Sequence, residues 1–229
     1  MFVPMFDFNY WILIGPALLF ALWAQAQVRG AYMEFARVRT LSGLTGADVA
    51  RDLLRRAGLH NVEVERIGGQ LTDHYDPRTH TVRLSAGVYD SASIAAVGIA
   101  AHECGHALQH AHGYAPLYLR NAIIPVTQIA SQAAFPLFFL GLVFQWAPIV
   151  WIGVYLFLAA VLFQLITLPV EFDASARALR VLRTGGYLSS DELGGARRVL
   201  SAAALTYVAA ALMAIMQFVY LLGLARRND

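Results

Sequence analysis

Long apolar runs and polar segments alternate along this chain of 229 residues. Four of the runs come close to or exceed the roughly 20 apolar residues with which a helix spans a bilayer. They cover about 8–26, 123–144, 148–168 and 202–224. The pattern predicts four transmembrane helices, with the larger polar segments after the first and after the third.

The polar segment after the first run shows the shorter periods of a compact domain. Thr45 and Asp48 have the spacing of a capping box, and apolar residues at helical spacing follow until Gly58, which predicts one amphipathic helix. Beyond it, apolar alternation predicts strands at 62–67, 71–75 and 81–85, the last two flanking a proline-containing turn. We expect these strands to form a small antiparallel sheet.

Composition supports a membrane protein and limits its partners. Hydrophobic residues make up 58% of the chain and charged residues 14%, and the mean hydropathy is +0.54. The net charge is only +2, and the basic residues form no block or tail, so nucleic acid is excluded as a predicted partner. The single cysteine, Cys104, has no partner for an internal disulfide and is interpreted as a small buried residue.

The arginines predict an orientation. They gather in the two polar segments, whereas the turn between the second and third runs is uncharged, so the positive-inside rule places both polar segments in the cytoplasm. Arg226 and Arg227 favour the opposite orientation, but the two segments share one side in either case. The first run has no basic segment before it and is interpreted as an uncleaved anchor. The chain is therefore predicted to have five parts. They are an anchor (1–27), a cytoplasmic domain (28–121), a transmembrane hairpin (122–168), a second polar segment (169–201) and a last helix with a tail (202–229).

The candidate chemistry lies in a His-Glu-x-x-His motif. His102 and His106 are four residues apart, so on a helix they are offset by only about 40° and can bind one metal ion. Glu103 lies beside them, as the carboxylate of a hydrolytic zinc site does. Asp90 or Ser91 is expected to cap the helix that carries the motif.

A catalytic zinc site takes a third protein ligand, and two further histidines are weak candidates. His110 continues the same helical face, but three ligands spaced by four residues would extend over ~12 Å, too far for one ion. His112 stands where the metzincin pattern has its third histidine. Gln109 replaces the glycine of that pattern, and a continuing helix would turn His112 away.

Glu171 is the third candidate. It follows the third apolar run, on the same side of the membrane as the motif, just after Pro169, which is expected to end or kink the helix. From the residues alone, Glu171 is equally well interpreted as a metal ligand or as an interfacial carboxylate that is solvated or paired with Arg177.

Six stretches, spread over nearly the whole chain, resemble one known family. The stretches are 71–77, 101–110, 113–117, 168–172, 195–197 and 202–210. In them the chain resembles the bacterial YugP-type family of membrane-bound neutral zinc metallopeptidases. Its layout is also similar to that of the HtpX-type and CAAX prenyl peptidases, in which a glutamate on a later helix is the third zinc ligand.

The resemblance implies a mainly α integral membrane protein, with four transmembrane helices and a small α+β zincin-like cytoplasmic domain. It implies Zn²⁺ held by His102, His106 and Glu171, with Glu103 as the general base. In relatives an aspartate often stands four residues after the third ligand. Ser175 occupies that place here, and its hydroxyl could still bond a ligand histidine.

The implied reaction is hydrolysis of a peptide bond by a zinc-activated water. The expected substrates are membrane or misfolded proteins, at the cytoplasmic face of a bacterial inner membrane whose lipid bilayer surrounds the spans. The strand at 81–85 would pair with an extended substrate through a free edge, or is an ordinary strand with a protected edge. Candidate oxyanion donors or outer contacts are His74, Tyr75, His110, Tyr114 and Arg177.

Two other classes of protein are compatible with parts of this pattern. The first is a zinc-binding membrane scaffold without catalysis, against which Glu103 counts, because a residue that is not a ligand has no role there. The second is an ion carrier, against which the small number of ionisable residues in the apolar runs counts.

Overall fold

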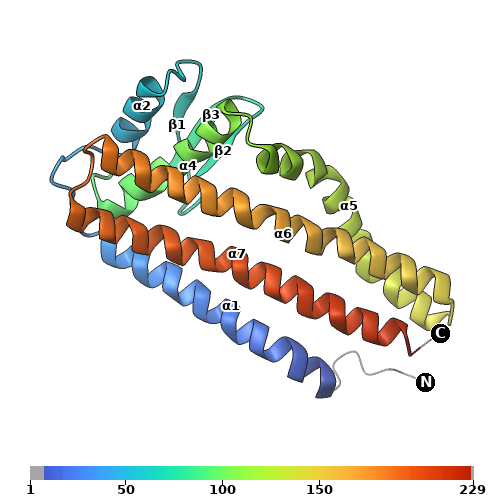
Figure 1. Cartoon of the computed structure of the whole chain (residues 1–229). Helices are drawn as coiled ribbons and strands as arrows, with labels where there is room; N and C mark the ends of the chain where they lie inside the picture. Colours follow the sequence, from blue (N-terminus) through green and yellow to red (C-terminus); the bar gives the residue numbers. More distant parts are fainter. Residues whose placement is uncertain (1–7, 228–229) are drawn as a thin grey trace. The chain divides into compact units, whose positions relative to one another are not determined.

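The computed structural model describes residues 8–227, in which seven helices and three strands follow one another (Figure 1). In chain order they are α1 (Phe8–Phe35), α2 (Gly46–Arg56), β1 (Glu63–Ile67), β2 (His74–Asp76), β3 (Thr81–Ser85), α3 (Ala86–Tyr89), α4 (Ile94–Ala111), α5 (Ala115–Val143), α6 (Ala147–Thr184) and α7 (Ser190–Ala225). The outermost ends of the first and last predicted parts, 1–7 and 228–229, lie outside the described residues.

Four of these helices, α1, α5, α6 and α7, are long and apolar enough to cross a membrane. The four predicted spans are thus present in length and composition. Of the two expectations for Pro169, an end of the helix or a kink, the first is wrong, because α6 continues through it to Thr184. A proline removes one main-chain donor from a helix, and the hydrogen bonds on either side can hold the remaining turns together.

The described residues divide into two compact units. The first contains 8–25, 119–168 and 206–227, and the second contains 26–118 and 169–205. In the first unit, α5 and α6 pack closely because glycines replace side chains at their contact. A Cβ atom at Gly153 would lie 2.7 Å from the backbone nitrogen of Phe138, which is fully buried.

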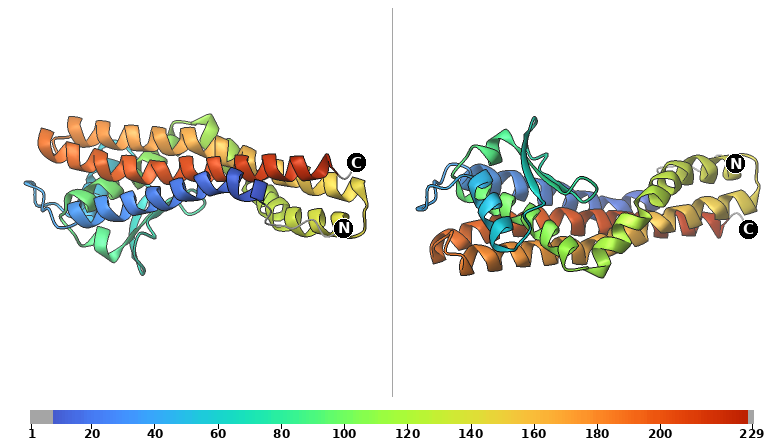
Figure 2. Two further views of the ribbon diagram at one scale, coloured as in Figure 1. Left: turned by 90° about the horizontal axis from the view of Figure 1, so that it is seen from below. Right: turned by 90° about the horizontal axis from the view of Figure 1, so that it is seen from above.

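The second unit holds the sheet, whose strand order is β1-β3-β2. β1 pairs with β3 in parallel and β2 pairs with β3 antiparallel, so the sheet is mixed and the prediction of an antiparallel sheet is wrong. The segment 68–73 carries the chain across to the other side of β3 instead of folding it back, so β2 and β3 form the hairpin. Figure 2 shows this sheet from two further sides.

Of the two interpretations of 81–85, the strand order confirms the ordinary strand with protected edges and contradicts the free edge. β3 is the central strand and is paired on both sides, whereas β2 lies at an edge of the sheet. Against the sheet pack α2 and α4, whose buried apolar residues form the core of this unit together with residues of β3, α3, α6 and α7.

The helix starts are set by local side chains. The predicted capping box at Thr45 and Asp48 is confirmed, with both reciprocal hydrogen bonds formed. α4 is capped by Ser93, which accepts from the Ala96 amide, and not by Asp90 or Ser91. The reason is the short helix α3, which delays the start of α4 by using Asp90 as its own C-cap.

Candidate metal centre

Three ligand atoms from α4 and α6 converge within the second unit. The Oε2 atom of Glu171 lies 3.3 Å from Nε2 of His102 and 3.6 Å from Nε2 of His106. All three donor atoms lie within 4.8 Å of one another. Bonds of ~2.0–2.1 Å to a tetrahedral zinc ion would place ligand atoms about 3.4 Å apart. Both the spacing and the two-imidazole, one-carboxylate donor set fit zinc.

The two helices come close together because of a glycine inside the motif. A Cβ atom at Gly105 would lie 2.6 Å from the carbonyl oxygen of Ala174, so α4 touches the backbone of α6 at this point. Ala174 stands one turn after Glu171. The small residue in α4 therefore sets the distance between the two histidines and the carboxylate.

The outer ring nitrogen of each histidine has a partner on the side away from Glu171. His102 Nδ1 lies 3.1 Å from the Ser175 hydroxyl, and His106 Nδ1 lies 3.0 Å from Oε1 of Gln109. A metal-binding histidine usually bonds a neighbour through its second nitrogen, which fixes the ring orientation. Both rings therefore present Nε2 to the space in front of Glu171.

Glu103 is buried beside these ligands. Burial raises the pKa of its carboxyl to about 7, and the nearby negative charges of Glu171 and Asp73 act in the same direction. His102 and the backbone N–H of Tyr75 in β2 partly offset this rise in pKa. A carboxyl whose pKa is close to neutral can accept a proton and return it, as a general base must.

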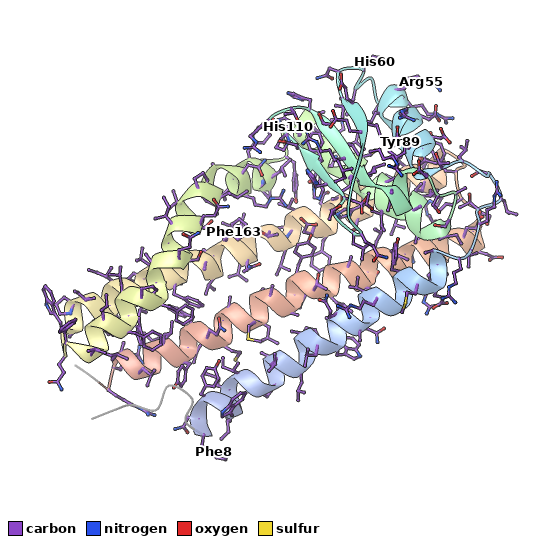
Figure 3. All side chains as sticks on the ribbon, turned by 180° about the vertical axis from the view of Figure 1, so that it is seen from behind. Phe8, Arg55, His60, Tyr89, His110 and Phe163 are labelled. Carbon is purple, nitrogen blue, oxygen red and sulfur yellow. The ribbon has the colours of Figure 1, made fainter. Side chains whose placement is uncertain are left out.

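Tyr75 and His110 form a separate polar cluster. The Tyr75 hydroxyl lies 2.9 Å from His110 Nδ1, and burial raises the pKa of Tyr75 to about 12. The His110 ring, labelled in Figure 3, stacks on His80 with the ring centroids 5.2 Å apart. These side chains line a cavity of about 230 Å³ together with Tyr118. Within residues 8–227, the converging donor group comprises His102, His106 and Glu171, and His110 lies outside it.

The other predicted residues bond elsewhere. His74 Nδ1 lies 2.9 Å from the Thr72 carbonyl oxygen, at an exposed position. The Tyr114 hydroxyl donates to the carbonyl of Pro169 at 3.4 Å, and a hydrogen bond of this length is weak.

Arg177 forms its ion pair with Asp173. Its Nε lies 2.6 Å from Oδ2 of Asp173, and its Nη1 lies 3.1 Å from Nδ1 of His112, which caps the C-terminus of α4. The Arg177 guanidinium also lies over the ring of Tyr114, 5.7 Å from its centroid. These contacts connect the end of α4 to α6 beside the donor group.

Gln109 and Asp173 are the contacts that the sequence analysis did not find. In the sequence Gln109 stands out only as the residue that replaces a glycine of the metzincin pattern, yet its side chain is fully buried between α4 and α6. A polar amide three residues after His106, on the helix face that carries both motif histidines, is the signal that could have indicated it.

Comparison with known proteins identifies relatives along nearly the whole chain. The model of the family described as "putative neutral zinc metallopeptidase" matches residues 10–226. The chain is 48% identical over 201 residues to the "putative membrane protease YugP" of Bacillus subtilis (strain 168), which covers 88% of this chain and 89% of that protein. No solved structure matches the chain. A match of this extent, carried by both comparisons, means that the chain belongs to this family of neutral zinc metallopeptidases.

Proposed function

We propose that the protein is a membrane-bound zinc endopeptidase, with His102, His106 and Glu171 as the metal ligands and Glu103 as the general base. The observation that carries the proposal is the convergence of the three donor atoms at zinc spacing, with a buried carboxyl of raised pKa beside them. Bound zinc would polarise the scissile carbonyl and lower the pKa of a water molecule from 15.7 toward ~7.

The chain's own residues supply the proton transfer and the positioning. Glu103 accepts a proton from the attacking water and delivers it to the nitrogen of the leaving amine. Ser175 holds the ring of His102, and Gln109 holds that of His106. The candidate oxyanion donors are His74, Tyr75, His110, Tyr114 and Arg177.

The substrate binds in extended form in this proposal, along β2. This strand has one edge that β3 leaves unpaired, and the backbone N–H of Tyr75 points from it toward Glu103. An extended peptide can add to such an edge through main-chain hydrogen bonds. The edge strand β2 thus takes the substrate-binding role that was one of the two interpretations of 81–85.

The proposed setting is the inner membrane of a bacterium, with the metal centre on the cytoplasmic side. The distribution of arginines supports this orientation. Membrane or misfolded proteins are the proposed substrates, because α6 carries Glu171 in continuation of an apolar span.

Removal of the metal is expected to abolish peptide hydrolysis reversibly. Purified protein in detergent should cleave an unfolded test protein, lose the activity on treatment with a zinc chelator, and regain it when stoichiometric Zn²⁺ is added back. Gel analysis of the test protein together with the zinc content measures both effects. Hydrolysis that persists in the metal-free protein would contradict the proposed function.

Replacement of Glu171 by alanine is expected to lower zinc affinity by more than ~100-fold, because the loss of a ligand exceeds the roughly 10–100-fold effect typical of a residue that only supports a ligand. Glu34→Ala is the matched control, since Glu34 is an exposed helical glutamate of the same unit, paired with Arg198. Competition with a zinc-binding dye measures both affinities. Equal affinities in the two variants would exclude Glu171 as a ligand.

A further inference from the structure

The amide of Gln109 is enclosed by three polar groups. Its Nε2 atom lies 2.8 Å from the carbonyl oxygen of Val170 and 2.8 Å from Oδ2 of Asp173. Its Oε1 atom lies 3.0 Å from Nδ1 of His106. The side chain is fully buried, so no water competes for these positions. The nitrogen of this amide therefore has two defined partners and its oxygen has one.

The partners on α6 determine which side of the Gln109 amide carries the NH₂ group and which side carries the oxygen. A backbone carbonyl can only accept hydrogen bonds, and an ionised carboxylate can only accept them as well. The same oxygen of Asp173 also accepts from Arg177 in their ion pair. The NH₂ group of Gln109 must therefore face Val170 and Asp173, and the amide oxygen must face His106.

An amide oxygen can only accept, so the atom that bonds it must donate. Nδ1 of His106 consequently carries the hydrogen, and in the neutral ring this leaves the lone pair on Nε2. Nε2 is the atom that faces Glu171. The orientation of the Gln109 amide thus determines the tautomer of His106, and this tautomer is the one that can bind a metal ion through Nε2.

Ser175 cannot do the same for His102. A hydroxyl group both donates and accepts, so the contact of 3.1 Å with Nδ1 is compatible with either tautomer. The two histidines of the motif are therefore held differently, His102 in orientation and His106 in orientation and tautomer.

We propose that Gln109 is a positioning residue that fixes His106 in the Nδ1–H tautomer and so prepares Nε2 to bind zinc. The proposal rests on the proposed metal site and extends it by one residue that does not itself touch the metal. It also assigns a role to Asp173 and Val170, which orient the amide of Gln109 rather than the imidazole.

Variants of the full-length protein can separate two roles of Gln109. One is to accept a hydrogen bond from His106, and the other is to hold α4 against α6. Gln109→Met keeps the approximate length but removes the acceptor. Gln109→Glu combined with Asp173→Asn keeps an acceptor for His106 and exchanges donor and acceptor in the contact between residues 109 and 173, while the Val170 carbonyl loses its donor, as it also does in Gln109→Met. Asp173→Asn alone is the control, because it removes the ion pair with Arg177 but leaves the oxygen of Gln109 facing His106.

The test uses Co²⁺ as the probe, titrated into metal-free protein in detergent, with its visible absorption spectrum as a measure of the ligand set. Gln109→Met should weaken Co²⁺ binding by about 10–100-fold. Asp173→Asn should bind within a few-fold of the wild type and keep its spectrum, and the double variant should bind more tightly than Gln109→Met, because both lose the donor to Val170 but only the double variant keeps an acceptor for His106. The unfolding temperature of the metal-free proteins measures, independently of metal binding, how much each variant weakens the packing of α4 against α6.

Two results would overturn the proposal. One is wild-type Co²⁺ affinity in Gln109→Met, and the other is an affinity that merely follows the unfolding temperature, with the double variant as weak as Gln109→Met. The readout is independent of catalysis. A wild-type protein that binds Co²⁺ but hydrolyses nothing, even with Zn²⁺, would refute the proposed function while Gln109 keeps its role.

Discussion

Glu103→Gln is expected to lose peptide hydrolysis by about 10²–10⁴-fold while it retains the zinc content of the wild type. The amide has the shape of the carboxylate but cannot accept a proton from water, so the reaction loses its general base. The metal is unaffected, because Glu103 is not among the converging donor atoms. Cleavage of an unfolded test protein and metal analysis of the same preparation measure the two quantities.

The same variant should be more stable than the wild type when both are free of metal. Burial raises the pKa of Glu103 from 4.5 to about 7, so the folded state holds a proton that the unfolded state releases. The wild type therefore loses stability as the pH rises from about 4.5 to 7, by at most ~3 kcal/mol for a shift of this size, and the neutral amide does not.

Thermal unfolding of the metal-free proteins from pH 4 to 8 checks this difference. The two curves should meet at the acidic end and separate toward neutral pH. Retained proteolysis in Glu103→Gln would refute the assigned mechanism, and a loss of zinc together with activity would make Glu103 a ligand instead.

Gly105→Ala is expected to weaken the metal site severely, although alanine favours helix formation by ~1 kcal/mol over glycine. The added Cβ atom would lie 2.6 Å from the carbonyl oxygen of Ala174, and neither backbone can yield without separating α4 from α6. Overpacking of this kind costs typically ~1–3 kcal/mol. The separation would also carry Glu171 away from His102 and His106, so zinc affinity should fall with stability.

Gly98→Ala is the matched control, because Gly98 stands in the same helix. A Cβ atom there would meet the Cβ of Ala196 at 3.5 Å, an ordinary van der Waals distance. This variant should be as stable as the wild type or slightly more so, with unchanged zinc affinity. Zinc titration and thermal unfolding of both variants check the pair. Equal behaviour of the two variants would show that the contact at Gly105 does not set the site.

The features that the sequence predicted well are those that depend on nearby residues. The four apolar runs, the capping box at Thr45 and Asp48 and the spacing of His102 and His106 follow from helix periodicity and bilayer thickness, which act over a few turns. Glu171 became a candidate through topology, because the hairpin returns the chain to the side of the motif.

The features that escaped prediction depend on pairings between distant segments. Whether β1 lies beside β2 or on the far side of β3 is decided by packing against α2 and α4, and the strand pattern is the same in both cases. The role of Gln109 depends on Val170 and Asp173, more than sixty positions along the chain from it. The start of α4 shifted because α3 formed before it, which the capping residues alone did not reveal.

Because the donor atoms are divided between α4 and α6, a bound metal ion would also stabilise the folded chain. Zinc bound by both His106 and Glu171 would cross-link the chain and close a loop that contains all of α5 and more than half of α6. By analogy with a disulfide that closes a loop of this length, such a clip would remove about 4 kcal/mol of chain entropy from the unfolded state. Loss of zinc in the cell would then lower the stability of the protein as well as its activity, so that the inactive form becomes the form most exposed to degradation.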